Sequence, residues 1–125
     1  MSVPILKQGD YLIASVQAAL TDGEVLKLRD DLAEQIGKYR SRGIVVDVTA
    51  LDIIDSFVAR SLRTIALTAS LRGAGTVIVG IQPDVAVAMV QFQLNLEPLQ
   101  TALDLEEGLE VLKRSTGGGR AEDGR

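Results

Sequence analysis

The segment Ile44-Val45-Val46-Asp47-Val48 decides the fold class of this 125-residue chain. Apolar and β-branched side chains fill both of its alternating positions, which is typical of a central strand covered on both faces. A second run of this kind, Thr76-Val77-Ile78-Val79-Gly80, follows later in the chain. Between the two, Val58, Leu62 and Ile65 recur at helical spacing. Strand, helix and strand in this order indicate an α/β fold.

The sequence before the first central strand predicts an amphipathic helix. Thr21 is followed three residues later by Glu24, so each side chain can satisfy a free backbone donor at a helix start. Apolar residues then recur at steps of three and four, namely Val25, Leu28, Leu32, Ile36 and Tyr39. We expect this helix to cover one sheet face, and Gly43 to close it in the left-handed conformation.

Shorter elements complete the expected order of the chain. Two paired strands are predicted at 3–6 and 11–16, separated by a turn at Gln8-Gly9-Asp10. A helix at 84–94, a short strand near 99–102 and a helix at 105–113 follow the second central strand. The sequence thus predicts a single α/β domain with a mixed, mostly parallel sheet of four to five strands and about four packed helices. We place this domain at residues 1–114 and a flexible, glycine-rich tail at 115–125.

The composition excludes several classes of function. Cysteine and histidine are absent, which removes thiol nucleophiles, imidazole bases and the common zinc ligand sets. The net charge of −4, with no basic stripe and no Trp, argues against nucleic acid as a partner. No apolar run is long enough to cross a bilayer. We therefore expect a soluble, cytoplasmic protein that is not an enzyme and needs neither metal nor cofactor.

Polar residues gather where the first central strand ends. In open α/β sheets ligands bind outside the carboxyl ends of the strands, and here that edge holds Asp47, Thr49, Asp52, Asp55 and Ser56. Asp55 or Ser56 is expected to cap the following helix, whose first N–H groups then carry partial positive charge. A phosphoryl group on Ser56 would bring about −1.5 to −2 charges and three acceptor oxygens to those N–H groups. Ser56 is therefore a candidate switch residue.

Less specific interpretations of the same residues stay open. Ser56 caps a helix and does nothing more if it behaves as most serines at such positions do. Arg60 and Arg63 fall on the same helical side as Ser56, where they either pair with a phosphate or remain solvated charges. Clustered carboxylates such as Asp47, Asp52 and Asp55 also hold Mg²⁺ in phosphoryl-transfer enzymes.

The predicted helix at 84–94 is apolar around most of its circumference, and only Gln91 and Gln93 suggest a solvated face. Such a helix is either wedged between two layers of its own domain or presents an apolar surface to another subunit. The sequence alone does not separate these alternatives.

Three segments carry a resemblance to a known family. The order of the predicted elements and the segment 43–60 resemble a STAS domain. More closely, three stretches are similar to the RsbS-type scaffold of the stressosome: Ile54-Asp55-Ser56-Phe57-Val58-Ala59, Gly80-Ile81-Gln82-Pro83-Asp84-Val85-Ala86-Val87 and Thr101-Ala102-Leu103-Asp104-Leu105-Glu106-Glu107-Gly108-Leu109-Glu110.

This resemblance implies a non-catalytic scaffold that associates with itself and with RsbR-type STAS paralogues. It implies an RsbT-type serine kinase that is sequestered, phosphorylates Ser56 under stress and then leaves, and an RsbX-type phosphatase that resets the scaffold. Asp52, Asp55, Phe57 and Arg60 would support the phosphorylation site or the docked kinase. The alternative is an anti-sigma-factor antagonist, a STAS protein that binds a different kinase one to one. Its usual motif is Asp-Ser-Ser-Gly, whereas Asp55-Ser56 is followed here by Phe57-Val58, which favours the scaffold.

Overall fold

A computed structural model describes residues 3–115 of the chain. The elements follow one another as β1 (Ile5–Gln8), β2 (Tyr11–Ser15), α1 (Asp22–Tyr39), β3 (Gly43–Asp47), α2 (Ser56–Leu71), β4 (Gly75–Val79), α3 (Pro83–Gln91), β5 (Gln100–Ala102) and α4 (Leu105–Ser115). The five strands form one sheet in the order β1-β2-β3-β4-β5. β1 and β2 are antiparallel, and all other neighbours are parallel. The predicted mixed, mostly parallel sheet with four helices is confirmed.

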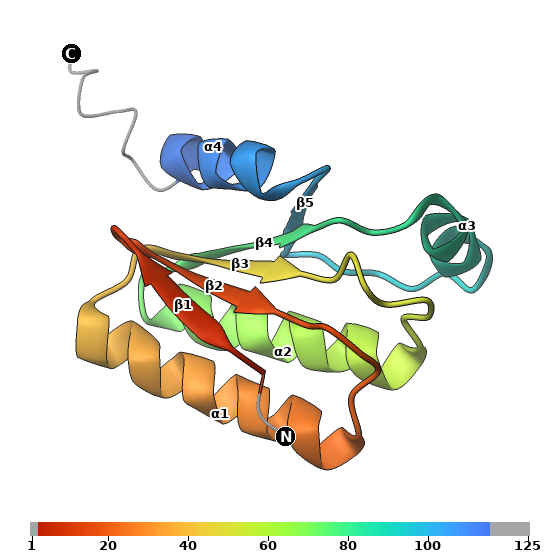
Figure 1. The fold of residues 1–125 in the computed structure, drawn as a ribbon, viewed down its shortest axis with the longest axis horizontal. Coiled ribbons are helices and arrows are strands. Elements are labelled where there is room, and N and C mark those ends of the chain that lie inside the picture. The colour runs from red at the N-terminus through yellow and green to blue at the C-terminus, as the bar shows by residue number, and fades with distance from the viewer. Residues whose placement is uncertain (1–2, 116–125) are drawn as a thin grey trace.

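The sheet lies between two unequal helical layers (Figure 1). α1 and α2 cover one face, where Ile44, Val46 and Ile78 of the central strands join the larger core. α4 covers the other face, where Val45 and Val77 pack with Leu112. β3 is buried on both faces because its side chains alternate between these two layers, as its continuous apolar run predicts.

α1 begins as predicted but ends differently. The Thr21 side chain accepts a hydrogen bond from the Glu24 backbone N–H, and the Glu24 carboxylate accepts one from the Thr21 N–H. The expected closure at Gly43 is wrong, because Arg40 takes the left-handed conformation at φ 51°. Gly43 instead starts β3, where a Cβ would lie 2.9 Å from Leu112 Cδ1. Its small size therefore lets α4 approach the sheet.

α3 lies beyond the carboxyl ends of β3 and β4 (Figure 1). It ends at Gln91 rather than at residue 94, because Gln93 adopts a positive φ of 56°. The wedged interpretation is wrong, since Val87 and Val90 on this helix are 57% and 78% exposed. Gln91 and Gln93 are also exposed, as expected.

Two expectations concern the ends of the fold. Ser115, the first residue of the expected tail, is the last residue of α4, and the rest of that tail, 116–125, lies outside the described residues. Among the helices described within residues 3–115, none combines the length and apolar character that crossing a bilayer demands.

Candidate functional site

The loop between β3 and α2 has a defined shape that sets the position of Ser56. At its start, the Asp47 carboxylate accepts hydrogen bonds from the Thr49 N–H (2.9 Å) and the Thr49 hydroxyl (2.7 Å). Further along, the side chains of Leu51 and Ile54 are buried in the larger core. These anchors hold the intervening backbone between the sheet edge and the first turn of α2.

Asp55, not Ser56, caps α2. Its carboxylate accepts a hydrogen bond of 2.9 Å from the Val58 N–H, and its backbone is extended. Ser56 is the first helical residue, its side chain is exposed, and its hydroxyl makes no hydrogen bond to any described residue. The interpretation of Ser56 as a simple cap is therefore wrong. Since Asp55 occupies the Val58 N–H, the N–H groups of Ser56 and Phe57 are the free donors at this helix start.

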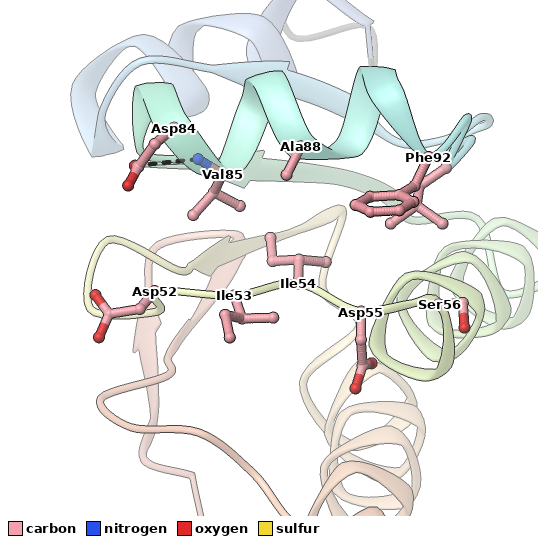
Figure 2. A pocket seen from close by; sticks show the side chains of 10 residues that line it. Asp52, Ile53, Ile54, Asp55, Ser56, Asp84, Val85, Ala88 and Phe92 are labelled. Atoms are coloured by element: carbon pink, nitrogen blue, oxygen red, sulfur yellow. Dashed lines mark hydrogen bonds between the residues drawn. The ribbon is translucent and has the colours of Figure 1, made fainter.

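A cavity of about 430 Å³ separates this loop from α3 (Figure 2). Its lining comprises Asp52, Ile53, Ile54, Asp55, Ser56, Asp84, Val85, Ala88, Phe92 and Leu94. The side chains of Val85, Ala88 and Phe92 point from α3 toward the loop, and Ile54 points back toward them (Figure 2). Ile53 and Phe92 border the cavity and are each 74% exposed. The site is thus an apolar cleft flanked by carboxylates, open to a partner's side chains.

The two walls of this cleft are tied together by their connecting loops. The Gln82 side-chain amide donates a hydrogen bond of 2.7 Å to the Thr49 carbonyl, which joins the start of α3 to the loop that carries Ser56. Gly80 has a φ of 83°, and a Cβ on it would overlap the Thr49 hydroxyl. The absence of a side chain at Gly80 therefore allows the loops that lead into the two walls of the cleft to pass in contact.

The residues that the sequence singles out divide between two surfaces. Asp52, Asp55 and Ser56 line the cleft, as described above. Phe57 and Arg60 instead line a groove between α1 and α2, together with Leu26 and Arg29. Arg63 does not reach toward Ser56, because its Nε donates a hydrogen bond of 3.0 Å to the Glu97 carbonyl. Any partner that contacts all of these residues must cover both surfaces.

The aspartates do not assemble into a metal centre. Within residues 3–115, no group of three or more carboxylate, His or Cys side chains is placed to hold a metal ion. Asp47 is engaged by Thr49, and Asp55 is engaged by the Val58 N–H. This arrangement gives the phosphoryl-transfer hypothesis no support.

Sequence reasoning did not identify the α3 wall of the cleft. Asp84, Val85, Ala88 and Phe92 become part of the site only because α3 folds back over the loop before α2. The available signal was the apolar character of α3 on nearly all sides, which indicated a second surface but not its location.

Removing the cap should cost stability without changing the cleft's apolar lining. We expect Asp55→Ala to lower the free energy of unfolding by about 1 kcal/mol, because the Val58 N–H loses its acceptor. Asp52→Ala is the matched control: its carboxylate is exposed, so its loss should change stability by less than about 0.5 kcal/mol. Urea denaturation measures both. Equal effects of the two substitutions would contradict the assignment of Asp55 as the cap.

Three comparisons place the chain among known proteins. A serine-to-glutamate variant of RsbS from Moorella thermoacetica is 36% identical, with a TM-score of 0.76 over 90% of this chain and 96% of that one. A chain from a structure of the stressosome, described as a signal integration and transduction hub, is 34% identical, with a TM-score of 0.71 over 90% of this chain and 97% of that one. The RsbT co-antagonist protein RsbRA of Bacillus subtilis (strain 168) is 23% identical over 117 residues.

RsbRA is a larger protein, and the match covers 93% of this chain but 43% of the length of RsbRA. The family model of the STAS domain matches residues 2–108, which include every strand and the beginning of α4. The chain belongs to the STAS domain family and is similar in structure to RsbS.

Proposed function

We propose that this chain is a non-catalytic stressosome scaffold that sequesters a serine/threonine kinase of the RsbT type and releases it when Ser56 is phosphorylated. The observation that carries this proposal is the separation of roles at the start of α2. Asp55 caps the helix, which leaves the Ser56 hydroxyl exposed at the border of an apolar cleft. The similarity to RsbS and to a stressosome chain supports the same assignment.

The cleft suits a docking surface for a partner's apolar side chain. Exposed Ile53 and Phe92 leave apolar area in water that a bound protein would cover, with a gain of about 25 cal/mol per Å². Asp52, Asp55 and Asp84 flank that area, so basic groups on the partner would find complementary charge.

Phosphorylation would oppose this docking through charge. A phosphate on Ser56 adds about −1.5 to −2 charges next to Asp55, on the loop whose other end carries Asp52 (Figure 2). The free N–H groups of Ser56 and Phe57 can stabilise this anion on the free scaffold. An apolar partner surface would have to desolvate it, so the modified scaffold favours the unbound state. An RsbX-type phosphatase would restore binding.

The exposed face of α3 supports self-association and contact with RsbR-type paralogues. Val87 and Val90 present apolar side chains at the carboxyl end of the sheet, where they remain in water in the single chain. A second STAS domain that packs there would cover them. Light scattering with an RsbR-type partner should detect particles far heavier than a dimer, whereas an anti-sigma-factor antagonist would give none.

Phosphorylation mapping tests the switch. The chain is incubated with an RsbT-type kinase and ATP, and mass spectrometry locates the modification. We expect one phosphate, on Ser56, and its loss in Ser56→Ala. Ser70→Ala, which removes an exposed hydroxyl near the other end of the same helix, should leave phosphorylation intact. Phosphate that persists in Ser56→Ala would refute the assignment.

A further inference from the structure

Arginines gather at the end of the sheet opposite Ser56. Arg40 follows α1, Arg42 precedes β3 and Arg72 follows α2. All three line one cavity of about 300 Å³, together with Gly37 and Ser41. The carboxyl ends of α1 and α2 therefore meet at a surface where three guanidinium groups share one hollow.

Two local features of the chain are unfavourable by themselves and yet serve this cluster. Arg40 has a φ of 51°, a conformation in which glycine would be free of strain. Gly37 lies inside α1, where alanine would be the better helix former. A Cβ at Gly37 would lie 2.5 Å from Arg72 Nη2, so the absence of a side chain at Gly37 leaves room for the Arg72 guanidinium. At both positions the residue present is less favourable for local stability, but it allows an arginine, Arg40 or Arg72, to lie at the cavity.

The charges around the cavity do not balance. Each helix terminus contributes about −0.5 of an elementary charge, and the Asp10 carboxylate lies 4.0 Å from Arg42 Nη1. Against three guanidinium groups these terms leave a net charge of roughly +1. No acidic residue is among the described residues that line the cavity. Capping of the two helices therefore accounts for only part of the positive charge.

Ser41 adds a polar group without a partner. Its residue is 5% exposed, and its Oγ is buried with no hydrogen bond to any described residue. A buried hydroxyl normally has a partner, because leaving it unpaired costs free energy. Ser41 lies in the chain between two of the arginines, and the residue lines the same cavity, although its Oγ is enclosed by the surrounding protein rather than exposed to the cavity.

We propose that this cavity is an oxyanion site that binds a phosphate group. Guanidinium groups form paired, charge-assisted hydrogen bonds with phosphate oxygens, and such a ligand would neutralise the excess positive charge. The cavity has room for more than a single phosphate ion. It can therefore hold either free phosphate or the phosphate group of a small phosphorylated molecule. The site is separate from Ser56 and does not depend on the kinase.

The proposal is tested by titrating the full chain with inorganic phosphate at constant ionic strength. Backbone ¹⁵N chemical shifts monitor the titration. We expect saturable shifts at residues 37–43 and 71–74 that chloride does not produce. Arg72→Gln should weaken binding about fivefold or more. Arg114→Gln, which removes an equal charge from α4, should leave it unchanged, and so should Ser56→Ala. A nucleoside monophosphate that binds about tenfold tighter than phosphate would identify a larger ligand, and equal affinity would identify free phosphate.

Two further variants separate a binding role from a structural one. Arg40→Gly relieves the backbone strain, so we expect the melting temperature to rise by about 2–4 °C while phosphate affinity falls. Gly37→Ala improves helix propensity but displaces the Arg72 guanidinium. It should therefore also raise the melting temperature and lower the affinity for phosphate. Shifts that chloride reproduces, or phosphate affinity unchanged in Arg72→Gln and Arg40→Gly, would overturn the proposal.

Discussion

Replacing Ser56 by glutamate is expected to weaken binding of an RsbT-type kinase by about 10- to 100-fold, which corresponds to about 1.4–2.8 kcal/mol. The carboxylate places a negative charge next to Asp55 at the border of the apolar cleft, where a docked partner would have to desolvate it. Surface plasmon resonance with immobilised kinase measures the change. The fold should remain intact, because a negative side chain in the first turn of α2 is favoured by the helix dipole.

Ser70→Glu is the matched control for this prediction. It introduces the same charge into the same helix, at an exposed position near the other end of α2. Kinase affinity should therefore stay within about twofold of that of the unmodified chain. If Ser56→Glu and Ser70→Glu weaken binding equally, net charge rather than the cleft governs the interaction, and the proposed docking surface is wrong.

Gly80→Ala should destabilise the fold by about 2–5 kcal/mol. A residue with a Cβ at this φ of 83° costs about 1–2 kcal/mol. The collision with Thr49 adds about 1–3 kcal/mol, because the added methyl overlaps its hydroxyl and lies 3.1 Å from its Cα. Urea denaturation measures the loss. Since the loops in contact at Gly80 and Thr49 lead into the two walls of the cleft, we also expect the variant to bind the kinase more weakly than its folded fraction explains.

Gly73→Ala separates the two causes of that loss. Gly73 has nearly the same φ, 84°, but a Cβ on it would meet nothing within 4 Å. It should therefore cost only the backbone contribution of about 1–2 kcal/mol and leave kinase affinity unchanged. Equal destabilisation by the two alanines would mean that the contact between Gly80 and Thr49 contributes nothing to the fold.

Much of the fold could be predicted because its signals are local and mutually consistent. The apolar run from Ile44 to Val48 required cover on both faces, and the Thr21–Glu24 pair defined the start of α1. The end of α1 was harder to predict. Glycine is the residue type that often closes a helix. Gly43, however, lies in β3, where it packs closely against Leu112, and the left-handed conformation that ends α1 falls on Arg40. Tertiary contacts, rather than local preference, decided whether Arg40 or Gly43 closes α1.

The candidate site was predictable only in part. Ser56 and its two neighbouring aspartates could be placed at the sheet edge, because strand ends and helix starts are local features. The choice of Asp55 over Ser56 as cap depends on side-chain geometry that either residue could adopt. The cleft depends on how α3 folds over a loop about 30 residues earlier in the chain. Local sequence patterns do not predict a contact between segments so far apart. Arg63 illustrates the same limit, since its partner is the distant Glu97 carbonyl.

The cap at Asp55 also bears on how such a protein can change over time. Since the helix start does not rely on the Ser56 hydroxyl, a chain that loses this serine should still fold, and under the proposed function it should still join the assembly. It would be an inert subunit, present in the assembly yet unable to respond. A mixture of responsive and inert subunits would then tune the amplitude of the signal, and natural variation at this single position could adjust it without any penalty in folding.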